Sequence, residues 1–113
     1  MRNGWPEGIA GEVELGDDDE NLLIPAIVMG TLEEAGFVNE VRGQTGSMLD
    51  VGQEAVFRGH EPLRQVAAAA LACEMVLASE HEPENDVARA FIGEVVRLCE
   101  LAQQRDTVLT IYL

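Results

Sequence analysis

The sequence contains no lysine, and its cations are seven arginines set against 21 aspartates and glutamates. The formal charge at pH 7 is therefore −14. Binding to nucleic-acid phosphates requires a basic surface, and so does attraction to an anionic membrane, so we expect neither as a direct partner. Two causes of the missing lysine stay open. A GC-rich genome favours arginine, whereas adaptation to salt would make the acidity a matter of solvation with no partner behind it.

Long apolar runs are also missing. The run from Leu22 to Met29, which contains Pro25, has eight residues and no run is longer, whereas a membrane-spanning helix needs about 20 apolar residues. No apolar stretch follows the basic start Met1-Arg2, so no secretory signal is indicated. We therefore expect a cytoplasmic protein.

Cysteine is scarce, occurring only at positions 73 and 99. Both cysteines fall at apolar positions of predicted helices, where a reduced thiol packs as a small hydrophobic group. Two cysteines in a chain of this length do not make a disulfide scaffold. A cysteine nucleophile would need an electropositive, accessible site, which an apolar stripe does not provide.

Motifs of enzymes are absent as well. The segment 43–47 lacks the lysine and the glycine spacing of a phosphate-binding loop, and no dinucleotide fingerprint or nucleophile elbow occurs. Nothing in the spacing of Ser47 and Ser79 relative to His60 and His81 indicates a Ser–His–acid site. We expect no enzymatic activity, no catalytic residue and no cofactor.

The apolar residues that are present, 47% of the chain, suffice for a folded core. We expect a single domain over residues 1–113, in which residues 1–18 are an irregular acidic arm anchored by Trp5. Within that segment, Val13 and Leu15 lie on one face of a possible short strand from Gly11 to Leu15.

Two stretches carry apolar residues at alternating spacings of three and four. One begins at Pro62 and runs to about Glu80, and the other begins near Asn85. A short turn between two such helices predicts an antiparallel helical hairpin. Gly93 lies inside the second helix, where glycine destabilises, so we expect another backbone to approach it closely, from the domain's own sheet or from a second protein.

The other segments are less regular. Residues 19–35 are predicted to form a buried helix that ends at Gly36. Pro25 lies either in the first turn of this helix or at a kink in a longer one. The capping pattern of residues 31–34 also allows a break near Gly30. Residues 37–42 and 106–113 are predicted strands, and residues 48–57 are ambiguous. The predicted fold class is α+β, a small antiparallel sheet packed on the hairpin plus one further helix, with a mainly α fold as the alternative.

Glu74 and Glu94 interrupt the apolar pattern of the two helices at similar heights of the hairpin. Paired carboxylates on facing helices can hold a metal or share a proton. The pattern lacks the Glu-x-x-His pairs of such sites, and the acidic turn 80–86 lacks the glycine and spacing of a calcium loop. Ion pairing with nearby arginines is the favoured interpretation, so we assign no metal site.

Acidic residues concentrate in two places. Residues 1–20 hold seven acids and one arginine, and residues 80–86 hold four acids. Such clusters steer association with basic surfaces. The predicted partner-binding residues are Asp17, Asp18, Asp19, Glu20, Glu80, Glu82, Glu84 and Asp86.

The favoured hypothesis is a small non-enzymatic acidic binding protein. It would dock on a basic protein surface, such as that of a nucleic-acid-binding enzyme, as an inhibitor, an immunity protein or a nucleic-acid mimic. One alternative is a homo-oligomeric structural or assembly subunit, in which surplus apolar surface of the hairpin is buried in a homodimer. The other is a carboxylate-dependent metal hydrolase.

Overall fold

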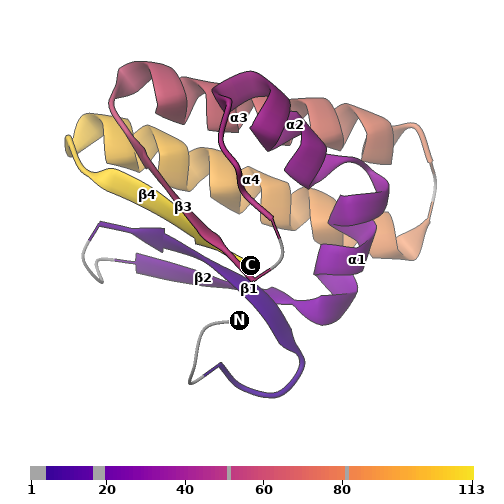
Figure 1. Cartoon of the computed structure of the whole chain (residues 1–113). Helices are drawn as coiled ribbons and strands as arrows, with labels where there is room; N and C mark the ends of the chain where they lie inside the picture. The colour runs from indigo at the N-terminus through magenta and orange to yellow at the C-terminus, as the bar shows by residue number, and fades with distance from the viewer. Residues whose placement is uncertain (1–4, 17–19, 51, 81) are drawn as a thin grey trace.

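The computed structural model describes residues 5–16, 20–50, 52–80 and 82–113. These residues form, in chain order, β1 (Ile9–Leu15), β2 (Glu20–Pro25), α1 (Ala26–Glu34), α2 (Phe37–Thr45), β3 (Glu54–Arg58), α3 (His60–Ala78), α4 (Pro83–Gln104) and β4 (Val108–Tyr112). The strands make one antiparallel sheet in the order β2-β1-β4-β3, and the helices lie together on one side of it (Figure 1). The predicted α+β class is confirmed.

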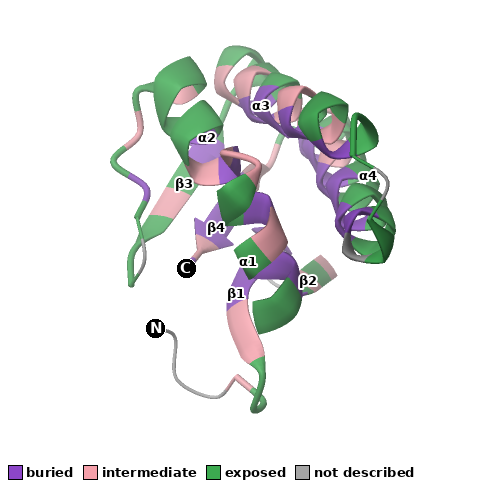
Figure 2. Ribbon diagram, turned by 90° about the vertical axis from the view of Figure 1, so that its right-hand side faces the viewer, coloured by how far each residue is buried: buried purple, intermediate pink, exposed green. Residues whose placement is uncertain are grey.

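The core lies between the sheet and the helices. Residues directly opposite each other in an antiparallel pair point to the same face, so Val13 and Ile111, which pair across β1 and β4, both point to the helices. Both side chains are fully buried. Figure 2 shows that the buried side of each long helix is turned inward.

Strand β1 lies at the centre of the fold, although residues 1–18 were expected to be an irregular arm. Residues 9–15 pair with β2 on one side, and residues 12–15 pair with β4 on the other. The short strand expected from Gly11 to Leu15 is confirmed and begins at Ile9, so the irregular arm does not extend over these residues. Burial of Val13 and Leu15 outweighs the polarity of the acids between them. At Gly11 a Cβ would lie 2.8 Å from the carbonyl oxygen of Tyr112, so the close approach of β4 requires glycine.

The sheet face opposite the helices carries Glu12 and Glu14, which are also buried. The Trp5 indole donates a hydrogen bond to Oε1 of Glu12 over 3.0 Å, and the Asn21 amide donates one to Oε2 over 2.6 Å. Trp5 thus holds the N-terminal segment to this face, as predicted.

The helix predicted over residues 19–35 is correct only in its second half. Residues 20–25 form β2, since Ile24 is buried in register with Gly11 of β1. Pro25 caps α1, which needs no amide donor at that position. The helix is unbroken at Gly30, and the Thr31 hydroxyl donates to the carbonyl of Ile27 within it.

Residues 37–42, predicted to form a strand, belong to helix α2. Gly36 has a left-handed backbone (φ 83°) that ends α1 and redirects the chain. Phe37 and Val41, four residues apart, both point into the core. The helical layer therefore contains two short helices beside the hairpin, and the ambiguous segment 48–57 becomes a strand only from Glu54.

The predicted hairpin is confirmed as α3 and α4, and the predicted C-terminal strand as β4. Helix α4 begins at Pro83, earlier than expected, because proline suits the first helical position. Gly93 is exposed, and no described residue comes within 4 Å of a Cβ built there, so the predicted close approach of the sheet is wrong. Among the described residues, no helix is both long and apolar enough to span a membrane.

Candidate acidic docking site

The two predicted acidic clusters lie at opposite ends of the molecule. Glu20 contacts Arg97 in the C-terminal half of α4, whereas Glu80 and Glu82 precede the first turn of that helix (Figure 1). Arg97 follows Pro83 by fourteen positions, which correspond to about 21 Å of helix at 1.5 Å per residue. Asp17, Asp18 and Asp19, together with the side chain of Glu84, lie outside the described residues.

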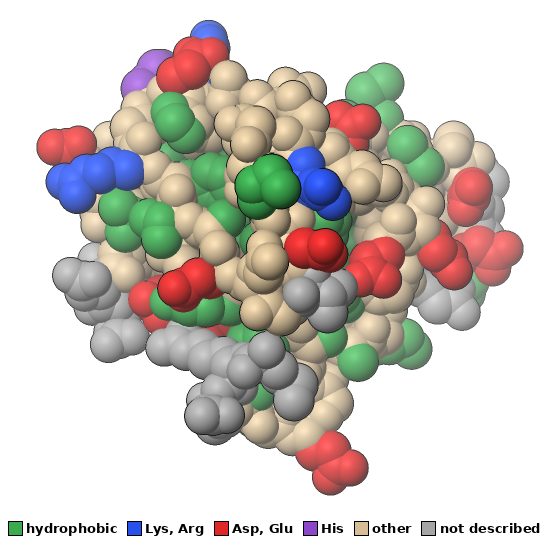
Figure 3. Space-filling model, viewed as in Figure 1, with side chains coloured by type: hydrophobic (Ala, Val, Ile, Leu, Met, Phe, Trp, Pro, Cys, Tyr) green, Lys and Arg blue, Asp and Glu red, His purple; other side chains and the backbone are tan. Residues whose placement is uncertain are grey.

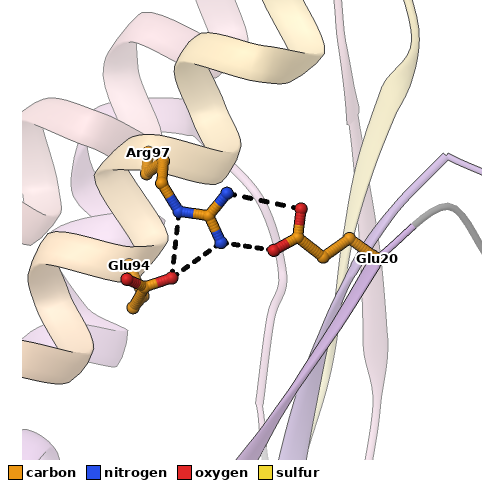
Figure 4. Close-up of polar contacts among 3 residues, drawn as sticks. All are labelled: Glu20, Glu94 and Arg97. Carbon is orange, nitrogen blue, oxygen red and sulfur yellow. Dashed lines mark hydrogen bonds and ion pairs between the residues drawn. The ribbon is translucent and has the colours of Figure 1, made fainter.

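At the first end, the charge of Glu20 is compensated. Arg97 donates through Nη1 and Nη2 to the Glu20 carboxylate, and through Nε and Nη2 to Oε2 of Glu94 at 3.0 and 2.7 Å (Figure 4). The hydrogen bond from Arg97 lowers the pKa of Glu20 below its ordinary value. Glu20 therefore holds β2 to α4, and its carboxylate is already engaged by an internal cation.

At the second end, a cleft of about 610 Å³ separates α1 from the connection between α3 and α4. We call it the acidic cleft. Three carboxylates line it, Glu34 from α1 and Glu80 and Glu82 from the connection. The remaining lining residues are Ala26, Ile27, Gly30, Thr31 and Asn85. The α1 residues recur at spacings of three and four, so they form one face of that helix.

No arginine of the described chain forms an ion pair with Glu34, Glu80 or Glu82. Figure 3 shows acidic side chains gathered at the right-hand end, where α1 and the α3–α4 connection lie in Figure 1. Like charges grouped around a concave surface focus the electrostatic potential and attract cations.

An apolar groove of about 250 Å³ adjoins the acidic cleft and shares Ile27 and Thr31 with it. Its other lining residues are Val28, Pro83 and Val87. Ile27 is 73% exposed and Val87 58% exposed, which is unusual for large aliphatic side chains. An apolar centre beside a charged rim is the composition of a protein–protein interface.

Asn85 gives the α3–α4 connection a defined shape. Its side chain is almost completely buried, and its Nδ2 donates to the carbonyl oxygens of Leu77 and Glu80, both at 3.2 Å. The backbone N–H of Asn85 also donates a hydrogen bond to the carbonyl oxygen of Glu82. These hydrogen bonds hold the backbone that carries Glu80 and Glu82 against the end of α3.

The sequence prediction and the cleft overlap in part. Glu80 and Glu82 line the cleft, whereas Asp86 is exposed on α4 outside the lining. Glu34 and Ile27 were missed, because nothing in the local pattern of α1 indicates that it packs beside residues 80–87. Asn85 was noted only as a helix start, although a polar residue between two apolar seams is a signal for a buried turn.

Glu74 and Glu94 have different arginine partners. Oε1 of Glu74 lies 3.6 Å from Nη2 of Arg89, and Glu94 pairs with Arg97. The ion pairing preferred from the sequence is confirmed for both. Among the described residues, no group of three histidine, cysteine or acidic side chains is arranged to hold a metal ion.

Both cysteines are buried free thiols, as predicted. Burial raises the pKa of the Cys73 thiol to about 11 and that of Cys99 to about 12, with smaller contributions from Glu40 and Glu100. Each thiol is therefore protonated at neutral pH and is a poor nucleophile.

Comparison with known proteins adds no relative to these observations: the chain matches no protein-family model, no curated protein and no solved structure.

Proposed function

We propose that the chain is a non-enzymatic binding protein that docks on a basic segment of another protein through the acidic cleft and the apolar groove beside it. The observation that carries this proposal is the set of three carboxylates, Glu34, Glu80 and Glu82, which border exposed aliphatic side chains and form no ion pair with an arginine of the described residues.

The two parts of the surface have different roles in binding. The carboxylates steer a cationic partner and raise its association rate, but exposed ion pairs contribute little affinity. Burial of Ile27 and Val87 supplies the apolar contribution, and central apolar contacts usually dominate an interface. We therefore infer a ligand in which arginine or lysine flanks a large apolar side chain.

Basic segments of this kind also occur on proteins that bind nucleic acid, because phosphates require the same cations. Occupation of such a segment would exclude nucleic acid, so the proposed roles are an inhibitor, an immunity protein or a nucleic-acid mimic. The two buried thiols suit a reducing compartment, and we place the proposed activity in the cytoplasm.

The test measures binding to two synthetic peptides, one with an arginine cluster around leucine and one with the leucine replaced by serine. We expect the leucine peptide to bind more tightly and both to bind more weakly as salt is added. The triple variant Glu34→Gln, Glu80→Gln, Glu82→Gln should lose about tenfold or more in affinity, equivalent to about 1.4 kcal/mol.

The control is the triple variant Glu7→Gln, Glu54→Gln, Glu100→Gln, which removes the same charge from exposed acids outside the cleft. Equal losses in the two variants would show that total charge, and not the cleft, attracts the peptide.

A second pair of variants leaves the charge unchanged. Gly30→Gln places a long side chain in the cleft, and Gly93→Gln places the same side chain on the exposed face of α4. A Cβ at either glycine meets no described atom within 4 Å, so both variants should fold. We expect only Gly30→Gln to weaken binding of the leucine peptide, and equal affinities would contradict the proposed site.

A further inference from the structure

Helix α3 has apolar side chains on its outer face as well as on its buried face. Between Arg64 and Glu80 the only charged residue is Glu74. Leu71 is 48% exposed and Met75 76% exposed, and Ala68 lies one turn before Leu71 on the same side. A helix that is apolar all round normally lies between two partners, and the described chain covers only one side of α3 (Figure 2).

We propose that this outer face is the interface of a twofold-symmetric homodimer, in which α3 of one copy packs antiparallel against α3 of a second copy. The proposal concerns a surface separate from the acidic cleft and does not depend on the proposed function.

Electrostatics favour a second copy over a basic partner at this face. Glu61 pairs with Arg64, and Glu74 pairs with Arg89, so the acids beside the outer face already have cations nearby. A basic ligand therefore finds little attraction here. Two copies that each carry −14 repel one another across most of their surfaces, and an apolar face with locally paired acids lowers that repulsion.

The shape of the face is complementary to itself. In a symmetric interface the same patch meets itself in reverse order. With the twofold axis between residues 71 and 72, Ala68 of one copy faces Met75 of the second copy, and Leu71 faces Ala72. Large and small side chains then alternate across the contact, as close packing requires.

The direction of the two helices and the size of the contact set the strength of the dimer. Antiparallel helices oppose their dipoles favourably. Because one helix pair covers less than the roughly 800 Å² per partner of a standard interface, we expect a weak, concentration-dependent dimer.

The test is sedimentation velocity of the full chain from about 1 μM to about 1 mM, a range chosen for weak association. The mass should rise from 12.3 kDa towards twice that value. Added sodium chloride should strengthen the dimer by screening the repulsion, whereas it should weaken peptide binding at the acidic cleft. A mass of 12.3 kDa at every concentration overturns the proposal.

Met75→Glu should abolish the dimer. Met48→Glu is a matched control, since both methionines are 76% exposed and Met48 lies outside α3. Because exposed positions tolerate substitution, both variants should fold. A dimer that persists in Met75→Glu, or is lost equally in Met48→Glu, overturns the assignment to α3.

The antiparallel register is tested separately. Ala68→Met should weaken the dimer, because this register sets it against Met75 of the second copy, and addition of Met75→Ala should restore it, because the large and the small side chain are then exchanged across the axis. Absence of rescue overturns this register.

Discussion

The two acidic ends of the molecule look alike in sequence but differ in structure. At the β1–β2 end, Arg97 binds both Glu20 and Glu94, so the carboxylate of Glu20 is engaged by an internal cation. At the α3–α4 end, Glu34, Glu80 and Glu82 line a cleft to which no arginine of the described part of the chain contributes. The number of acids in a segment therefore does not tell how many of them remain available to a partner.

The ends also differ in how their backbones are held. A surface ion pair fastens Glu20 to α4, whereas the buried amide of Asn85 fastens the α3–α4 connection. Buried hydrogen bonds to backbone carbonyls lack access to water when their donor is removed, so their loss costs more than the loss of an exposed ion pair. Substitutions at the two ends should therefore change the stability of the fold by different amounts and in different directions.

The largest effect is expected from Asn85→Ala. It removes the donor to the carbonyls of Leu77 and Glu80, and the free energy of unfolding should fall by about 2 kcal/mol. Urea unfolding measures the change, and peptide binding at the acidic cleft should weaken as well. In Asn39→Ala, which alters an exposed residue of α2, we expect a change within about 0.5 kcal/mol. Similar losses in both variants would remove the special role of Asn85.

A smaller effect, opposite in sign at the two ends, should follow neutralisation of one acid. Glu20→Gln removes an attraction to Arg97 and should lower the urea midpoint. Glu80→Gln removes repulsion from neighbouring carboxylates and should leave the midpoint unchanged or raise it. The two variants carry equal net charge, so a shift of the same sign in both would contradict the difference between the ends.

The smallest effect is a pH dependence confined to the Glu20 end. Since Arg97 lowers the pKa of Glu20 in the folded state, their interaction stabilises the fold above the ordinary pKa of 4.5. This stabilisation is lost as the pH falls through the lowered folded value. The difference in unfolding midpoint between the wild type and Arg97→Gln should therefore be present at pH 7 and shrink below about pH 4.5.

Urea unfolding of both proteins from neutral to acidic pH measures this difference. A gap that stays constant over that range would mean that Arg97 stabilises the fold through packing rather than through the charge of Glu20.

The elements predicted correctly share one property, which is that burial follows a local period. Leu63 and Val66 in α3, and Ala88 and Phe91 in α4, continue helical seams over several turns. Strand β4 is the exception, because its residues 109–111 are all buried, and its β-branched side chains rather than an alternation of burial identify it. The incorrect predictions fall on short segments, where few residues define a period and one long-range contact decides the outcome.

Residues 20–25 and 37–45 illustrate the errors. Leu22 and Leu23 fit a helix as well as a strand, and pairing with β1 selects the strand. Phe37 and Val41 are compatible with either element, and burial beside α3 selects the helix. In both cases the partner that decides is another segment of the chain, which no local pattern describes.

The candidate site shows the same difference between local patterns and contacts of distant segments. By itself, the sequence determined the excess of negative charge, the acids of the α3–α4 connection and the helical hairpin that presents them, because these depend on composition and on neighbours along the chain. Only the tertiary structure decided that Arg97 neutralises Glu20, that α1 brings Glu34 and Ile27 beside the connection, and that the outer face of α3 stays uncovered. The physical reason is that ion pairs and burial depend on which distant segments pack together.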